Sequence, residues 1–245
     1  MLEVRSVTKR FGGLVALADV TFAVEAGEVV GLVGPNGSGK STLFGVISGF
    51  FRPESGQVFF GGRNVTGLAP HRIARLGIGR TFQIAQPLPE FTCLDAVALG
   101  ILYANGERSL QSARKAAREV LEEVGLADFW AARTADLTMV NLRRLELARA
   151  LSVRPKLLLL DEVFAGLTPA EIREATELIK RLKARRNLTV IMTEHIPAAI
   201  LEVCTRVIVL DQGRILAVGS PAEIARDPRV IEVYLGPAGA RGADA

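Results

Sequence analysis

The stretch that decides the fold is Gly34-Pro35-Asn36-Gly37-Ser38-Gly39-Lys40-Ser41-Thr42. It follows the apolar run Val29–Val33 and precedes a helical segment, residues 42–47. In this order, G-x-x-x-x-G-K-S, backbone N–H groups surround an anion at a helix start, and a lysine adds positive charge that reaches the β and γ phosphates. The stretch therefore predicts a phosphate loop that binds a nucleotide, with Lys40 on the phosphates and the Ser41 hydroxyl as a Mg²⁺ ligand.

Apolar runs farther along the chain predict a mainly parallel sheet. Residues 157–160, 190–192 and 207–210 are apolar without alternation, which is typical of strands covered on both faces. Between the first two, Thr168-Pro169-Ala170-Glu171 combines an N-cap, a proline at the first helical position and a capping-box glutamate, and so predicts a helix start. The fold class is therefore α/β, a phosphate-loop NTPase core.

Two other segments predict structure outside this core. Residues 1–33 are interpreted as strands, with apolar runs at 22–24 and 29–33. Together with a hairpin that turns at Gly61-Gly62 between 58–60 and 63–65, they indicate an antiparallel β lobe. Apolar residues at helical spacing over 112–126 indicate that the middle of the chain is helical.

Composition excludes several classes. With 245 residues, 49% of them apolar, the chain can bury a sizeable core, which excludes disorder and collagen-like or disulfide-framework proteins. The net charge of +4 is not concentrated in one stretch, so no nucleic acid partner is expected. Cys93 and Cys204 lack metal-site spacing and are interpreted as buried thiols in a reducing compartment. No apolar run approaches about 18 residues, so the sequence predicts no membrane span.

Three polar side chains follow the buried runs. Asp161 and Glu162 end the first run, and His195 follows the second. Neighbouring strand residues point to opposite faces, so the two carboxylates diverge unless the chain turns there. A turn would let one carboxylate bind Mg²⁺ and the other polarise water. Beside a phosphate loop, His195 is interpreted as a γ-phosphate contact. Solvated carboxylates and a structural histidine remain the alternatives.

These motifs together resemble the ATP-binding subunits of ABC transporters. The resemblance rests on residues 34–42, Gln83 in Arg80-Thr81-Phe82-Gln83, Leu160-Asp161-Glu162 and Glu194-His195, in that order. Further features resemble the ATPase subunits of branched-chain amino-acid importers: Lys9-Arg10-Phe11-Gly12-Gly13-Leu14, residues 143–150, Ala165-Gly166-Leu167 and Val233-Tyr234-Leu235-Gly236.

The resemblance implies a role for individual residues. It implies ATP and Mg²⁺ as cofactors, with Phe11 stacked on adenine beside the loop residues 34–42. Ser41, Gln83 and Asp161 would hold the metal. The implied catalytic residues are Glu162, which polarises water, His195 at the γ-phosphate, and Gln83, which also links to the membrane partner.

The resemblance also implies a layout and partners. Residues 1–235 would form a single ABC ATPase domain, with a core of 1–83 and 151–235 that includes the antiparallel lobe, a helical lobe at 84–150 and a flexible tail at 236–245. The expected partners are transmembrane permease subunits and a second ATP-binding subunit, in a homodimer or a heterodimer. The chain would then be peripheral at the cytoplasmic face of the inner membrane.

Three positions depart from the family pattern. In the family, the signature loop has the sequence LSGGQ; here it is Leu137-Thr138-Met139-Val140-Asn141. Val140 places a β-branched side chain where the family's glycine approaches the γ-phosphate of the facing subunit. Val163 replaces a proline, and Thr168 replaces an aspartate or asparagine.

Several functions are compatible with these features. The first is the ATP-hydrolysing motor subunit of an importer of branched-chain or other amino acids. One alternative is the ATPase subunit of a lipid or lipopolysaccharide exporter, which Phe164-Ala165-Gly166 and the carboxy-terminal stretch also resemble. The other is a low-turnover regulatory subunit, which the altered signature favours. A GTPase or small-molecule kinase is disfavoured, because no Asn-Lys-x-Asp motif occurs and the spacing from Lys40 to Asp161 leaves room for an inserted lobe.

Overall fold

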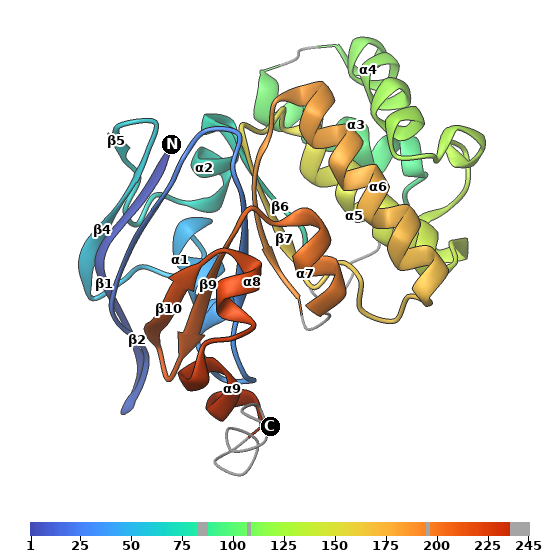
Figure 1. Cartoon of the computed structure of the whole chain (residues 1–245). Helices are drawn as coiled ribbons and strands as arrows, with labels where there is room; N and C mark the ends of the chain where they lie inside the picture. The colour runs from blue at the N-terminus through green and yellow to red at the C-terminus, as the bar shows by residue number, and fades with distance from the viewer. Residues whose placement is uncertain (83–87, 107–108, 195–196, 236–245) are drawn as a thin grey trace. The chain divides into compact units, whose positions relative to one another are not determined.

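The computed structural model describes residues 1–82, 88–106, 109–194 and 197–235. The chain divides into two compact units (Figure 1). The first contains Met1–Pro70 and Ile191–Ala245, and the second contains His71–Val190. Strand β8 (Thr189–Thr193) crosses the division. Among the described residues, no helix is both long and apolar enough to cross a bilayer.

The first unit contains the predicted antiparallel sheet, which has four strands; the strand at 29–33, which the sequence assigned to the same lobe, instead pairs in parallel in the other sheet. The strands of the antiparallel sheet are β1 (Leu2–Phe11), β2 (Leu14–Val24), β4 (Ser55–Phe60) and β5 (Arg63–Asn64), in the order β2-β1-β4-β5. The β4–β5 turn is made by Gly61 and Gly62, whose φ angles of 56° and 77° favour glycine.

The same unit contains the strands around the phosphate loop. Strand β3 (Val29–Val33) pairs in parallel with β9 (Arg206–Asp211), which pairs antiparallel with β10 (Arg214–Gly219). Helix α1 (Lys40–Ile47) follows β3 after the loop. The carboxyl-terminal helices are α7 (Pro197–Val203), α8 (Pro221–Ile224) and α9 (Pro228–Leu235).

The second unit combines two parallel strands with helices. Strand β6 (Ile78–Arg80) pairs with β7 (Leu157–Asp161), whose residues are all buried. Helix α2 (Pro70–Leu76), which begins at the last residue of the first unit, precedes β6, and its His71 is exposed. Helices α3 (Cys93–Asn105), α4 (Leu110–Glu123) and α5 (Met139–Ser152) pack together, with short 3₁₀ turns at Ala127–Phe129 and Thr134–Asp136.

Local signals explain two of these helices. Helix α6 (Pro169–Arg186) begins with the predicted capping box, in which Thr168 and Glu171 bond reciprocally. In α4, the alanines at 113 and 117 and the apolar residues at 120 and 121 are buried, while charged residues occupy the other face. The α/β fold with antiparallel strands and helices is therefore the one that the sequence predicts, and Cys93 and Cys204 are both buried.

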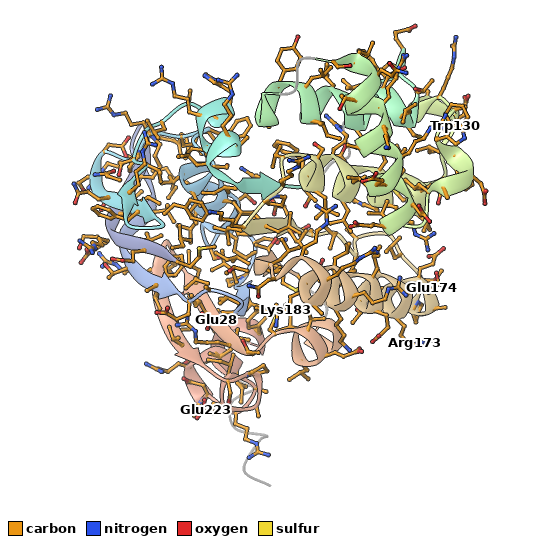
Figure 2. All side chains as sticks on the ribbon, turned by 90° about the horizontal axis from the view of Figure 1, so that it is seen from above. Glu28, Trp130, Arg173, Glu174, Lys183 and Glu223 are labelled. Atoms are coloured by element: carbon orange, nitrogen blue, oxygen red, sulfur yellow. The ribbon has the colours of Figure 1, made fainter. Side chains whose placement is uncertain are left out.

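A bidentate ion pair joins Glu28, the residue before β3, to β9 in the first unit. Arg206 donates from Nε and Nη2 to the carboxylate of Glu28, at 2.6 and 3.0 Å, and also bonds the Ala23 carbonyl (Glu28 is labelled in Figure 2). Burial raises the pKa of Glu28, but hydrogen bonds from Arg206 and from the Glu25 N–H outweigh it, so the pKa lies below its usual value.

The lowered pKa makes stability depend on pH. The stabilisation is present above the unfolded pKa of a glutamate and is lost as pH falls through the lower, folded pKa. We expect Glu28→Gln to lower the free energy of unfolding by about 1–2 kcal/mol at pH 7, with a smaller loss below pH 4. Urea unfolding of both proteins across pH measures this. Glu3→Gln is the control, because its pair with Arg5 is exposed; a Glu28→Gln loss that does not change with pH would contradict the assignment.

Candidate nucleotide site

The first glycine of the phosphate loop is fixed by close packing. Gly34 has a φ of 152°, and a Cβ there would lie 2.1 Å from the Leu210 carbonyl oxygen and 2.6 Å from Ser38 Oγ. The loop is also tied to the β9–β10 turn, because the Gly213 N–H donates to the Ser38 carbonyl. No side chain fits at Gly34 without displacement of the backbone of β9.

This packing predicts unequal effects of two alanine substitutions. Gly34→Ala must displace a backbone oxygen, so we expect it to lower the free energy of unfolding by more than about 3 kcal/mol or to prevent folding. At Gly37 a Cβ would have no atom within 4 Å, so Gly37→Ala causes no clash. Its only cost is the φ of 79°, which is unfavourable for alanine by about 1–2 kcal/mol. Thermal unfolding followed by circular dichroism compares them, and equal losses would contradict the close approach at Gly34.

The start of helix α1 has the form of an anion site. Gly39 is its N-cap, with a φ of 108° and no side chain to accept from the first N–H groups, and the first turn contains no acidic residue. A Cβ at Gly39 would lie 2.6 Å from the Ala16 carbonyl oxygen. The helix start therefore presents N–H groups and the positive end of the helix dipole without a competing side-chain oxygen.

The lysine of the motif lies within the loop. Lys40 is only 6% exposed, and its Nζ donates to the carbonyl oxygens of Gly34 at 2.7 Å and Pro35 at 2.9 Å. Asn36, Gly37 and Ser41 are exposed at the same loop. The loop thus combines a held ammonium group with accessible residues.

In the second unit, β7 ends at the predicted carboxylates. Asp161 is buried and pairs with Arg80, with 3.0 Å between Oδ2 and Nη2, and its N–H donates to Thr81 Oγ1. Glu162 has a left-handed φ of 49°, so the chain turns directly after the strand. This turn is the condition under which the two neighbouring carboxylates serve different partners.

The remaining predicted site residues are placed unequally. Phe11 ends β1, is partly exposed, and forms an edge-on contact with Phe51 at 5.1 Å between ring centroids. Gln83 and His195 lie outside the described residues, as does the tail 236–245. The phosphate loop belongs to the first unit, and the carboxylates belong to the second.

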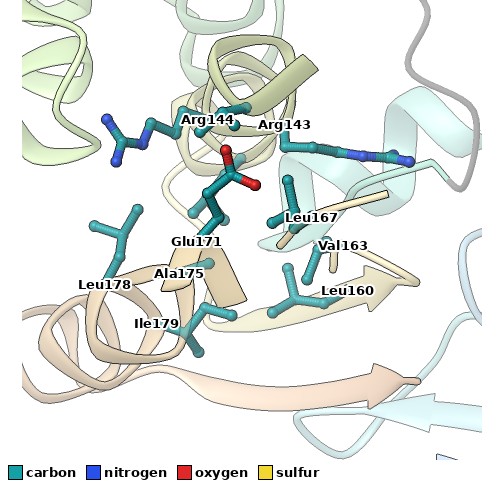
Figure 3. Close-up of a pocket in the computed structure, with 11 residues that line it drawn as sticks. Arg143, Arg144, Leu160, Val163, Leu167, Glu171, Ala175, Leu178 and Ile179 are labelled. Atoms are coloured by element: carbon teal, nitrogen blue, oxygen red, sulfur yellow. The ribbon is translucent and has the colours of Figure 1, made fainter. Parts of the chain in front are cut away.

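The altered signature begins a helix. Thr138 is the N-cap of α5, and its Oγ1 accepts from the Asn141 N–H at 3.4 Å. Met139 is exposed, whereas Val140 lines a small cavity of about 30 Å³ inside the second unit. Val163 and Leu167 line the same cavity (Figure 3), so two of the three departures from the family pattern share one space. The third, Thr168, caps α6.

The sequence did not indicate two of these contacts. The ion pair of Arg80 with Asp161 joins residues on adjacent strands, and a hydrogen bond joins the Tyr234 hydroxyl to the Gly34 N–H. Both are long-range in sequence. For the second contact, the sequence offers only the stretch 233–236, whose resemblance to the importer subunits does not indicate a partner for Tyr234.

Strand, glycine loop and helix, together with parallel pairing, define a phosphate-loop NTPase. The family model for ABC transporters matches residues 17–165, and a model described as branched-chain amino acid ATP-binding cassette transporter matches 214–236. The chain belongs to the ATP-binding cassette family of ABC transporters, and it is an ATPase that powers transport.

Individual relatives match over nearly the whole chain. The branched-chain amino acid transport ATP-binding protein BraF of Pseudomonas aeruginosa is 38% identical over 97% of this chain and 98% of its own. The lipopolysaccharide export ATP-binding protein LptB of Acidithiobacillus ferridurans is 36% identical over 96% and 97%.

Solved ABC transporter cassettes match over at least 90% of this chain. The ADP conformation of an ABC transporter cassette is 30% identical, with a TM-score of 0.86 over 96% of this chain and 98% of its own. A post-hydrolysis cassette bound to ADP and Pi, solved as a dimer, is 27% identical, with a TM-score of 0.81 over 90% and 99%.

Proposed function

We propose that this chain is the motor subunit of an importer of branched-chain amino acids, and that it binds ATP on the loop 34–42. The observation that carries the nucleotide site is the loop itself, where Gly34 and Gly39 allow no side chain and Lys40 is held inside. The cargo is supported by the match of residues 214–236 and by relatives such as BraF.

The loop residues fit a bound phosphate chain. The N–H groups at the start of α1 have no side-chain cap, and Ser38 Oγ is buried without a hydrogen-bond partner among the described residues. Unsatisfied buried hydroxyls are uncommon in folded proteins, so an oxygen-rich ligand is a natural partner here. Lys40 would exchange the carbonyls of Gly34 and Pro35 for phosphate oxygens. Phe11 would stack on the adenine.

The remaining site residues are proposed to bind the metal and to activate the attacking water. Ser41, Gln83 and Asp161 are the proposed Mg²⁺ ligands; a serine hydroxyl and a carboxylate are hard oxygen donors of the kind that Mg²⁺ prefers. When bound, the metal neutralises charge on the phosphates. Glu162 would polarise the attacking water, and His195 would contact the γ-phosphate. Arg80 would release Asp161 or share it with the metal.

The proposed partners follow from the family. Transmembrane permease subunits and a second ATP-binding subunit would complete the transporter, and the dimeric solved cassette supports the second ATP-binding subunit. The helical lobe 84–150 would dock on the permease, while 1–83 and 151–235 hold the nucleotide. The chain would then lie at the cytoplasmic face of the inner membrane as a peripheral subunit, without a nucleic acid partner.

Reconstitution tests the cargo. The chain is combined in proteoliposomes with the permease and binding-protein subunits encoded beside it, and uptake of labelled leucine is measured with and without ATP. ATP-dependent uptake that is lost with Glu162→Gln supports the proposal. Absence of uptake, with intact ATP hydrolysis, contradicts the cargo but not the motor.

A lipopolysaccharide exporter is the second candidate. LptB of Acidithiobacillus ferridurans is nearly as similar as BraF, so overall identity separates the two functions poorly. The match of residues 214–236 to a branched-chain amino acid model favours import. If ATP hydrolysis by the reconstituted complex drives release of lipid but no uptake of leucine, the chain is assigned to an exporter instead of an importer.

A further inference from the structure

The last described helix reaches back to the first glycine of the phosphate loop. In the first unit, the Tyr234 hydroxyl oxygen near the end of α9 accepts a hydrogen bond from the Gly34 N–H. Tyr234 and Val33, the residue before Gly34, also line one cavity. Two independent observations thus place α9 beside the start of the loop.

Gly34 connects this tyrosine to the lysine of the motif. Its N–H donates to Tyr234, and its carbonyl accepts from Lys40 Nζ at 2.7 Å. Gly34 is wedged against the Leu210 carbonyl, so it has little room to move alone. A shift of the tyrosine is therefore transmitted to the residue that holds the lysine.

The packing beside helix α9 is incomplete. The helix borders a solvent-open, mainly apolar groove of about 190 Å³, lined by Val207, Ile224 and Val230 among others, and Tyr234 itself is 48% exposed. A helix beside such a groove makes fewer packing contacts and is held less firmly. The hydroxyl of Tyr234 supplies a directional contact that fixes its end.

We propose that Tyr234 is a positioning residue of the nucleotide site, whose hydroxyl holds Gly34 so that docking of α9 and nucleotide binding favour each other. This inference rests on the proposed nucleotide site at the loop 34–42. When phosphates take Lys40 away from the loop carbonyls, the bond to Tyr234 remains to hold the start of the loop. By linkage, a nucleotide that orders the loop must then also stabilise α9.

The first test is nucleotide affinity. The chain has two tyrosines, so Tyr103→Phe, on exposed α3 surface, is a matched control for Tyr234→Phe. Calorimetry with ADP and Mg²⁺ is expected to show three- to tenfold weaker binding for Tyr234→Phe and no change for Tyr103→Phe. Circular dichroism and the melting temperature confirm that both variants are folded.

The second test is a readout that a merely structural role would not move. Hydrogen exchange of the amides at 228–235 is expected to slow on addition of ADP and Mg²⁺ to the wild type. Tyr234→Phe is expected to exchange at one rate with and without nucleotide. The proposal is overturned if hydrogen exchange at 228–235 in the wild type has the same rate with and without nucleotide. It is also overturned if Tyr234→Phe binds ADP with wild-type affinity.

Lys40→Ala separates this proposal from the one on which it rests. If the wild type binds ADP and Lys40→Ala does not, the nucleotide site stands, and normal binding by Tyr234→Phe then overturns only the role of the tyrosine. If the wild type binds no ADP, or Lys40→Ala binds it equally well, both proposals are overturned.

Discussion

Lys40→Ala is expected to weaken ATP binding at least a hundredfold. The side chain is buried inside the loop, where its ammonium group already bonds two carbonyl oxygens at 2.7 and 2.9 Å. Phosphate oxygens are stronger acceptors than these carbonyls, and each charge-assisted bond contributes about 1.5–3 kcal/mol. Loss of two such bonds corresponds to a factor of a hundred or more, which calorimetry with ATP measures.

The control for this substitution is a lysine on the surface. Lys180→Ala removes the same charge from α6, where the ammonium group pairs with Glu177 at 2.9 Å. We expect its ATP affinity to equal that of the wild type. If Lys40→Ala retains wild-type affinity while it remains folded, the loop is not the site of phosphate binding.

Glu162→Gln is expected to retain ATP binding and to lose hydrolysis by a factor of a hundred or more. The chain turns at Glu162, whose φ is left-handed, directly after Asp161, and Asp161 is engaged by Arg80. The amide preserves size and hydrogen bonding but removes the charge that draws a proton from water, and general bases contribute about 10²- to 10⁴-fold. Single-turnover hydrolysis of bound ATP measures the chemical step alone.

Glu174→Gln is the matched control for this second substitution. Glu174 lies on α6 and is labelled in Figure 2, and its exposed carboxylate pairs with Arg144 of α5. It is expected to hydrolyse ATP at the wild-type rate. A Glu162→Gln protein that turns over ATP normally would assign the polarising role to a different residue.

The local features of this fold were predictable from the sequence. The strands at 157–161, 189–193 and 206–211 follow from unbroken apolar runs, and the start of α6 follows from its capping box. The phosphate loop is local as well, since nine consecutive residues set its geometry. Each of these depends on neighbours in the chain.

Other features escaped prediction because their causes are distant or mixed. The bounds of strand β1 could not be predicted within the strand-like region 1–33, since Arg5, Lys9 and Arg10 interrupt its apolar alternation and bulges shift its register. The sequence could not decide whether the chain turns at Glu162, because strand alternation alone cannot place a positive φ. The bonds of Arg80 to Asp161 and of Tyr234 to Gly34 join segments that only the folded chain brings together.

The small cavity shared by Val140 and Val163 has an evolutionary consequence. Because both side chains line one space of about 30 Å³, a change of volume at either position alters the packing of the other. In an alignment, the two positions are therefore expected to covary. A glycine at 140 alone would enlarge the void and loosen the start of α5, so the effect of that substitution is expected to depend on the residue at 163.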